Sequence, residues 1–152
     1  MVKPLMIRRS REPAKEILDE QAKAWASKPA LRKIYSRYFD LAFQSCLPGS
    51  TLELGAGSGV LKKCGYSVLS TDLETTSGID VVSDAQLLPF RDKSFDNIFA
   101  IDVFHHIERP VRLLREACRV LKPGGRLVLL EPGITWTSFW FYNYFHPEPV
   151  DI

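Results

Sequence analysis

The stretch Thr51-Leu-Glu-Leu-Gly-Ala-Gly-Ser-Gly-Val60 decides the fold of this 152-residue chain. Its first four residues predict a short buried strand, and glycines follow at positions 55, 57 and 59. Because glycine has no Cβ, the backbone can turn sharply there and a ligand can lie directly against it. A helix that begins near Ser58 would point free N–H groups at that ligand. The stretch therefore predicts a strand, a turn and a helix that bind a nucleotide-type cofactor, with a tight turn that binds no ligand as the alternative.

The spacing of the glycines decides between cofactors. The dinucleotide fingerprint requires G-x-G-x-x-G, but the third position is Val60 when counted from Gly55 and Lys62 when counted from Gly57. The Lys-Ser/Thr pair that ends a P-loop is missing as well. The spacing therefore disfavours a nicotinamide oxidoreductase and a P-loop nucleotide site.

Composition places the chain among ordinary globular domains. Hydrophobic residues make up 45% and charged residues 25% of the chain, whose length suits one domain with one core. The net charge of +2 is uneven, because residues 1–40 carry +5 and the remainder carries −3. This asymmetry is compatible with an anionic substrate or a membrane surface, although a solvated helical face explains it more simply. The chain lacks the basic and aromatic pattern of a nucleic-acid-binding module, so no nucleic-acid partner is expected.

The cysteines indicate a reducing compartment. Cys46, Cys64 and Cys118 are scattered, without a C-x-x-C motif or a histidine at ligand spacing, so neither disulfides nor a metal site are expected. No apolar run approaches the roughly 20 residues that span a bilayer. The N-terminus lacks the apolar core of a signal peptide. We therefore expect a cytoplasmic protein.

Alternating helix and strand signals predict the architecture. We expect helices at 12–26, 31–43 and 110–121, and strands at 51–54, 67–71, 80–83, 97–101 and 126–130. This alternation predicts an α/β fold, with a doubly wound, mostly parallel sheet that follows a helical cap. We expect one structural domain, with a basic tail and helical cap over 1–47, an α/β core over 48–132 and an aromatic-rich segment over 133–152.

Two acidic residues follow predicted strands behind the glycine turn. Asp72, roughly 20 residues after the turn, can accept both hydroxyls of a ribose, with helix N-capping as the alternative and Glu74 as a substitute. Asp84 can accept the exocyclic amine of adenine, and the N–H of Ala85 can donate to a ring nitrogen. Apolar neighbours such as Leu87 could sandwich the ring, whereas a cap or turn role for Asp84 is the alternative.

Two histidines follow the fourth predicted strand. Residues 102–106 would lie at the carboxyl edge of the sheet, where open α/β folds bind ligands. His105 could act there as a general base, because the unperturbed pKa of histidine lies near neutrality. His106 lies nearer the next helix and is expected to be structural. The alternative for either histidine is capping or packing that helix.

Six motifs occur in order along residues 53–126. They are Glu53-Leu-Gly-Ala-Gly-Ser-Gly, Ser70-Thr-Asp, Asp84-Ala-x-x-Leu-Pro-Phe, Phe95-Asp-x-Ile, Val103-Phe-His-His-Ile and Arg119-Val-Leu-Lys-Pro-Gly-Gly-Arg. The ordered set resembles the type 11 branch of the class I S-adenosylmethionine-dependent methyltransferases. The resemblance implies a Rossmann-like methyltransferase fold, S-adenosylmethionine as cofactor and methyl transfer to an unidentified acceptor, expected to be a small apolar or anionic molecule. The alternative is a non-catalytic cofactor-binding or interaction protein.

The resemblance also implies a set of site residues. His105 is the candidate catalytic residue. The expected cofactor-binding residues are Glu53, Gly55, Ala56, Gly57, Asp72, Leu73, Asp84, Ala85 and Ile101.

The chain departs from the family pattern in three places. Few residues separate the glycine turn from the second strand, so the first helix is expected to be short. Residues 73–79 leave no room for a full crossover helix, which predicts a rudimentary third strand. The family's closing antiparallel strand pair has no counterpart after residue 130, so we expect either a sheet abbreviated at the C-terminus or a fragment of a longer protein.

Seven aromatic residues crowd positions 136–145. Such density buries a large apolar area when it packs and favours association when it does not. We expect packing against the sheet, a missing lobe or a partner chain, so this segment could form a homo-oligomer. The alternative is one wall of the acceptor pocket, with Trp25, Tyr35 and Tyr38 opposite.

Overall fold

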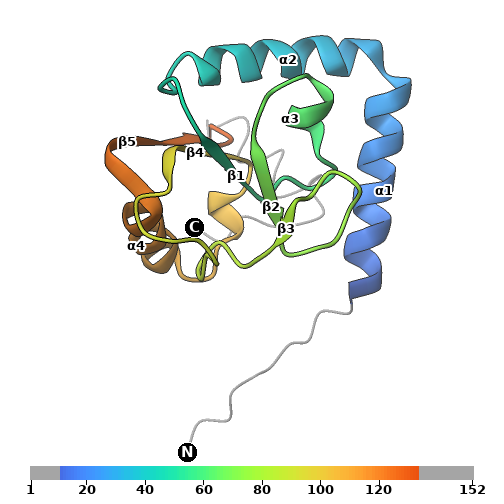
Figure 1. The fold of residues 1–152 in the computed structure, drawn as a ribbon. Helices are drawn as coiled ribbons and strands as arrows, with labels where there is room; N and C mark the ends of the chain where they lie inside the picture. Colours follow the sequence, from blue (N-terminus) through green and yellow to red (C-terminus); the bar gives the residue numbers. More distant parts are fainter. Residues whose placement is uncertain (1–10, 134–152) are drawn as a thin grey trace, which may run out of the picture.

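Five parallel strands form the centre of the computed structural model, which describes residues 11–133 (Figure 1). The strands are β1 (Thr51–Leu54), β2 (Leu69–Asp72), β3 (Val81–Val82), β4 (Phe95–Ile101) and β5 (Leu121–Leu130). Their spatial order is β3-β2-β1-β4-β5, and each neighbouring pair is parallel. The order reverses direction at β1, which is the switch point where open α/β sheets bind ligands. The predicted α/β fold with a parallel sheet is confirmed.

Helices cover both faces of this sheet. They are α1 (Arg11–Ser27), α2 (Pro29–Phe43), α3 (Val60–Lys63) and α4 (Pro110–Val120), with a 3₁₀ turn, η1, at Phe104–His106. In Figure 1, α2 runs along one side of the sheet and α4 lies toward the other, while α1 descends at an angle to α2. The predicted N-terminal helices are therefore present and precede the sheet.

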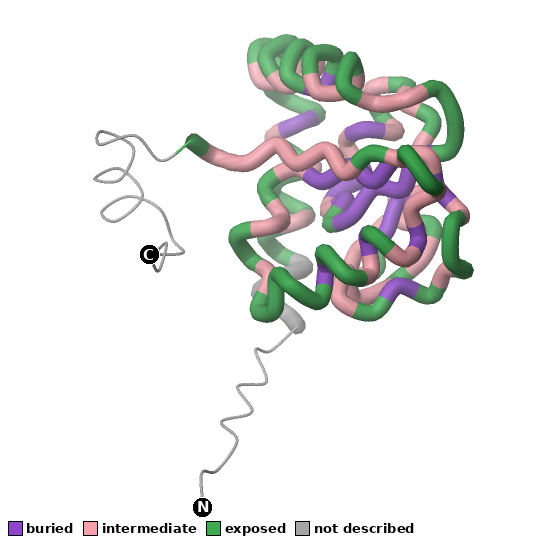
Figure 2. Tube along the Cα trace, turned by 90° about the vertical axis from the view of Figure 1, so that its left-hand side faces the viewer, coloured by how far each residue is buried: buried purple, intermediate pink, exposed green. Residues whose placement is uncertain are grey.

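The strand β4 shows how the two faces are filled. Successive side chains of a strand point to opposite faces. Ile98 and Ala100 accordingly pack with Leu113 of α4, whereas Phe99 packs with Phe39 of α2. Figure 2 shows the buried residues gathered along these central strands and the exposed residues along the outer sides of the helices.

The two expected short elements are confirmed. The helix α3 contains four residues, and β3 contains two. The chain crosses from β2 to β3 without a helix, and Gly59 and Gly78 approach so closely that a Cβ on Gly59 would lie 2.8 Å from Cα of Gly78. This close contact of two backbones holds the connection between β2 and β3 against the glycine turn.

The start of β5 differs from the prediction. Leu121 already pairs with Phe95, and Arg126 pairs with Asn97, so residues 122–125 form an extra loop within the ladder. The Lys-Pro-Gly-Gly turn thus interrupts β5 instead of preceding it. The pairing partner of Leu121 lies 26 positions earlier in the chain, so the local sequence does not predict this contact.

Two predicted segments, the basic tail at 1–10 and the aromatic residues at 136–145, lie outside the described residues.

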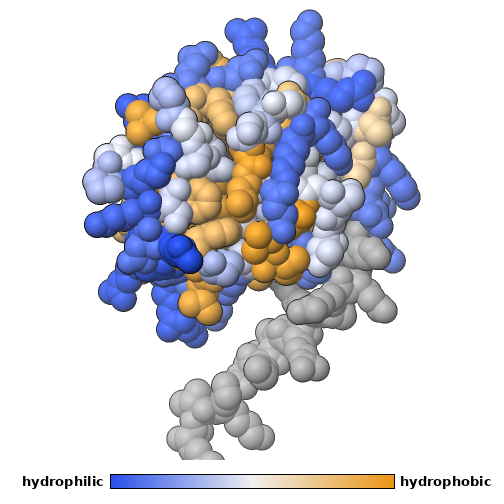
Figure 3. Space-filling model, in the orientation of Figure 1, coloured by the Kyte–Doolittle hydropathy of each residue, from blue (hydrophilic) through white to orange (hydrophobic). Residues whose placement is uncertain are grey.

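Within 11–133, no helix combines the length and apolarity needed to cross a bilayer. On the face shown in Figure 3, apolar side chains gather across the middle, between hydrophilic margins.

Candidate functional site

A cavity of about 940 Å³ lies at the carboxyl ends of the strands. The ends of β1, β2 and β4 line one side of it, together with the residues that follow β3 and β4. The helices α1 and α2 line the other side. Its volume lies at the upper end of the range for small-molecule and cofactor sites. The topology and the cavity therefore coincide at the switch point beside β1.

The glycine turn after β1 forms one edge of the cavity. Gly55 has φ +63°, and a Cβ there would lie 2.3 Å from Cγ2 of Val103. Gly57 has φ +53°, and a Cβ there would lie 3.4 Å from Cδ2 of Leu18 in α1. Only glycine adopts these conformations without strain. The turn therefore exposes bare backbone toward the cavity, with α1 lying over it.

Asp72, at the end of β2, is fixed by two backbone groups. Its Oδ2 accepts a hydrogen bond of 2.8 Å from the N–H of Gly57, and its Oδ1 accepts one of 2.9 Å from the N–H of Glu74. No helix follows Asp72 directly, so the alternative role as a helix N-cap does not apply. Each carboxylate oxygen keeps a second lone pair, and the residue lines the cavity.

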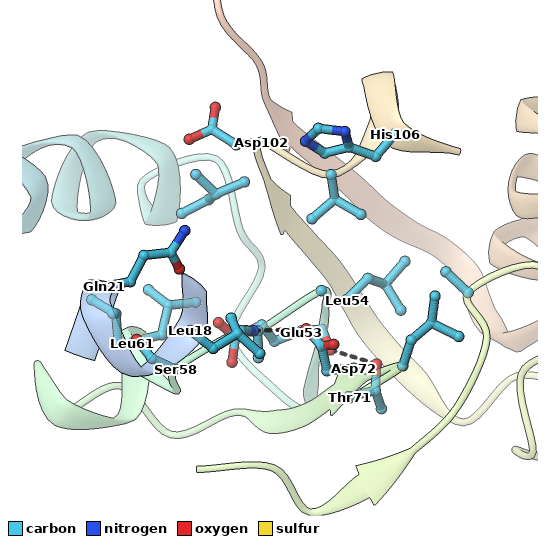
Figure 4. Close-up of a pocket in the computed structure, with 18 of the residues that line it drawn as sticks. Leu18, Gln21, Glu53, Leu54, Ser58, Leu61, Thr71, Asp72, Asp102 and His106 are labelled. Carbon is cyan, nitrogen blue, oxygen red and sulfur yellow. Dashed lines mark hydrogen bonds between the residues drawn. The ribbon is translucent and has the colours of Figure 1, made fainter. Parts of the chain in front are cut away.

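Glu53 lies on the floor of the cavity, close to Asp72 (Figure 4). It is 6% exposed, and the hydroxyl of Ser70 donates a hydrogen bond of 2.5 Å to its Oε2. Burial raises the pKa of Glu53 to about 7, and the hydrogen bond from Ser70 partly opposes this rise. Glu53 therefore changes its charge near neutral pH, inside the proposed cofactor site.

Asp84 and Ala85 line the cavity beyond β3. Oδ1 of Asp84 accepts a hydrogen bond of 2.8 Å from the N–H of Gln86 and one of 3.2 Å from its Nε2. The carboxylate is thus held in a turn and keeps capacity for a further donor. Leu87 is 77% exposed and is not among the residues that line the cavity, so it does not provide the expected apolar wall.

The two histidines of η1 have adjacent rings, with centroids 3.9 Å apart, but different surroundings. His106 lines the cavity and lies near Asp102 in Figure 4. His105 does not line it; its Nδ1 lies 2.6 Å from Oε2 of Glu131, just after β5. Glu131 also accepts hydrogen bonds from the N–H groups of Val103 and Phe104 through its Oε1. His106, and not His105 as expected from the sequence, therefore lines the cavity, while His105 contacts Glu131.

All nine residues predicted to bind the cofactor line this one cavity. They are Glu53, Gly55, Ala56, Gly57, Asp72, Leu73, Asp84, Ala85 and Ile101. Trp25 and Tyr35 also line it, as considered from the sequence, whereas Tyr38 is 50% exposed and does not.

Two residues of α1 that line the cavity, Leu18 and Gln21, were not predicted from the sequence. They lie on this helix together with Trp25. They are three and four positions apart, so they share one helical face, and this spacing was the available signal. Within residues 11–133, no group of three His, Cys, Asp or Glu residues is placed to hold a metal ion.

Comparison with known proteins is consistent with this geometry. A family model described as a methyltransferase domain matches residues 52–129. A probable tRNA methyltransferase 9B from Bos taurus is 34% identical over 73% of this chain and 25% of its own length. The ubiquinone/menaquinone biosynthesis C-methyltransferase UbiE from Laribacter hongkongensis is 32% identical over 66% of this chain and 50% of its own length.

A solved structure shares the fold. It is a SAM-dependent methyltransferase from Thermotoga maritima, a possible histamine N-methyltransferase, with a TM-score of 0.65 and 21% identity. The match covers 78% of this chain and 60% of that one. This chain spans about a quarter of the length of the tRNA methyltransferase relatives that it matches.

Proposed function

The chain belongs to the class I S-adenosylmethionine-dependent methyltransferases, with a type 11 domain, and from this we propose that it transfers a methyl group from S-adenosylmethionine to a small molecule. The observation that carries the proposal is the convergence of nine residues from separate motifs on one cavity. These residues come from the ends of β1, β2 and β4 and from the segment after β3. Their convergence at the switch point is the arrangement that cofactor binding requires.

The residues present fit this cofactor. The backbone of the glycine turn would hold the methionyl part, because no Cβ obstructs Gly55 or Gly57. Asp72 would accept the ribose hydroxyls through its remaining lone pairs. Asp84 would accept the amine of adenine, and the N–H of Ala85 would donate to the ring. When bound, the cofactor supplies a methyl group that its sulfonium has already activated.

The chain's own contribution is positioning and exclusion of water. Direct transfer needs two reacting atoms held in line, and such positioning lowers the barrier substantially. The face of α1 that carries Leu18, Gln21 and Trp25 would cover the reacting groups and keep water out. His105, predicted from the sequence as a general base, stays a proposal, and its pairing with Glu131 suits a positioning role better.

A small-molecule acceptor fits the cavity better than a tRNA. The similar proteins include both tRNA and quinone-pathway methyltransferases. Here Trp25, Tyr35 and Phe39 from α1 and α2 close the side opposite the sheet. Their rings contact one another, with centroids 6.2 Å apart for Trp25 and Tyr35. An enclosed aromatic wall accommodates a compact acceptor.

Calorimetric titration tests this function. The full chain is titrated with S-adenosylmethionine, S-adenosylhomocysteine and NAD, and we expect the first two to bind. Asp84→Asn should weaken both, whereas Glu20→Gln, on the exposed side of α1, should not. Tight binding of NAD with none of S-adenosylmethionine would overturn the proposal. Transfer of labelled methyl to bulk tRNA but to no small molecule would overturn the acceptor class, and binding without any transfer would favour a non-catalytic protein.

A further inference from the structure

Asp and Glu side chains line the cavity together with one histidine, His106. Five carboxylates line it, and among its lining residues in the described part of the chain there is no Lys or Arg; the five are Glu53, Asp72, Asp84, Asp102 and Glu108. A cleft lined by one sign of charge concentrates ligands of the opposite sign.

Three basic residues on α2 and α3, two helices that line the cavity, have partners elsewhere. The guanidinium of Arg32 donates to the carbonyls of Trp25 and Ala26 at 2.7 and 2.6 Å. The ammonium of Lys63 donates to the carbonyl of Ser58 at 2.7 Å, and that of Lys62 pairs with Asp80. None of these three side chains lines the cavity. No Lys or Arg among the described residues therefore lines the cavity, although burial, which raises the pKa of Glu53 to about 7, leaves that carboxyl group only partly charged at neutral pH.

The proposed cofactor accounts for only part of this charge. Glu53, Asp72 and Asp84 lie at or near the ends of β1, β2 and β3, where the cofactor would bind. Asp102 and Glu108 instead flank η1, beyond the end of β4. In Figure 4, Asp102 and His106 lie across the cavity from Glu53 and Asp72. Asp102 thus remains on the side left for the acceptor, and Glu108 lines the cavity from the other end of η1.

Aromatic side chains also line the cavity. Trp25 is 8% exposed, and its ring lies edge-on to that of Tyr35, whose ring in turn contacts Phe39 at 5.8 Å. All three residues line the cavity. Aromatic faces attract cations as well as apolar groups. Carboxylates combined with aromatic rings form a surface that suits an organic ammonium ion and repels an organic anion.

We propose that the acceptor is an apolar or aromatic amine, which enters the cavity as an ammonium ion beside Asp102 and Glu108. This inference rests on the proposed methyl transfer and names its acceptor class. The anionic acceptor that the uneven charge of the chain allows is disfavoured, because Asp102 and Glu108 would repel it.

Methyl transfer to the amine requires that its nitrogen first lose a proton. The ammonium first gives one proton to the carboxylate of Asp102, and its nitrogen gains a lone pair. That lone pair forms the new N–C bond while the C–S bond of the donor breaks, and the electron pair of the broken bond stays on sulfur. The proton on Asp102 then passes to water. Partial burial and the nearby charge of Glu131 raise the pKa of Asp102, and His105 and His106 partly oppose this rise, so Asp102 accepts a proton more readily than an ordinary aspartate.

Three small molecules that share a phenylethyl group test this inference. The full chain is saturated with S-adenosylhomocysteine and titrated with 2-phenylethylamine, 3-phenylpropanoate and 2-phenylethanol, which differ mainly in charge. We expect the amine to bind roughly tenfold or more tightly than the acid. Asp102→Asn and Glu108→Gln should each weaken amine binding by roughly threefold to tenfold. Binding of the alcohol should change by less than about twofold, since it lacks the charge.

Glu20→Gln is the matched control, because it removes an exposed carboxylate of α1 that does not line the cavity. Binding of S-adenosylhomocysteine confirms that each variant is folded. Equal binding of acid and amine, no amine binding at millimolar concentration, or unchanged amine affinity in both variants would overturn the inference. Failure of S-adenosylhomocysteine to bind the unaltered chain would instead overturn the proposed function, so the two failures are distinguishable.

Discussion

The backbone N–H of Gly57 donates a hydrogen bond of 2.8 Å to Oδ2 of Asp72. One carboxylate therefore joins the end of β2 to the glycine turn after β1. The same side chain lines the cavity in which the cofactor would bind. Its structural and ligand-binding roles are thus combined, and a substitution at this position should affect both.

Replacing Asp72 should separate these two contributions. We expect Asp72→Ala to weaken S-adenosylmethionine binding by about 1–3 kcal/mol, the scale for lost hydrogen bonds to a charged group. The free energy of unfolding should also fall, because the N–H of Gly57 loses its acceptor. Calorimetry measures the first effect and urea denaturation the second. A folded variant with unchanged affinity would show that Asp72 is purely structural.

Gly55 should not tolerate a side chain. We expect Gly55→Ala to lower the free energy of unfolding by roughly 2–5 kcal/mol, from strain at positive φ and from collision with Val103. Gly65→Ala is the control, because Gly65 also has positive φ but no atom within 4 Å of a built Cβ. Urea denaturation should show a smaller loss there. Equal losses in the two variants would exclude the contact with Val103 as a cause.

The ionisation of Glu53 should make stability depend on pH. Its pKa is raised from 4.5 to about 7 by burial, so between these values the folded state binds a proton that the unfolded state has lost. The stability contribution of this site is therefore full below pH 4.5 and declines as the pH rises to about 7. The total decline is at most about 3 kcal/mol.

Glu53→Gln should remove this decline. Relative to the unaltered chain, the variant should gain stability as the pH rises from 4.5 to 7, as measured by urea denaturation at several pH values. Glu20→Gln, at an exposed position, should show no such relative gain. Parallel pH profiles for Glu53→Gln and the unaltered chain would contradict the raised pKa.

His105 should act mainly through Glu131. Once an acceptor has been identified, His105→Ala should lower kcat by less than about tenfold, since His105 does not line the cavity. The dependence of kcat on pH should keep its shape. Glu131→Gln should produce a similar loss, because it weakens the same contacts to η1. A loss of roughly 10²–10⁴ with a flattened pH profile would instead make His105 a general base.

The sequence predicted those parts of the site that depend on the backbone conformation of individual residues. The bounds of β1 and the need for glycine after it follow from residue type at each position, because only glycine adopts positive φ without strain. The short α3 and the two-residue β3 follow from chain length, since few residues were available. The start of β5 was wrong, because it depends on pairing between Leu121 and Phe95.

The sequence by itself determined the glycine turn, the carboxylates at the strand ends and the family to which the chain belongs, because these depend on residue types at short spacings. Tertiary structure alone decided which of two adjacent histidines lines the cavity, since Glu131 binds His105 from 26 positions away. It also decided that α1 covers the glycine turn, bringing Leu18 against Gly57. Such choices depend on contacts between distant segments, and the local sequence around each residue carries no information about its partner.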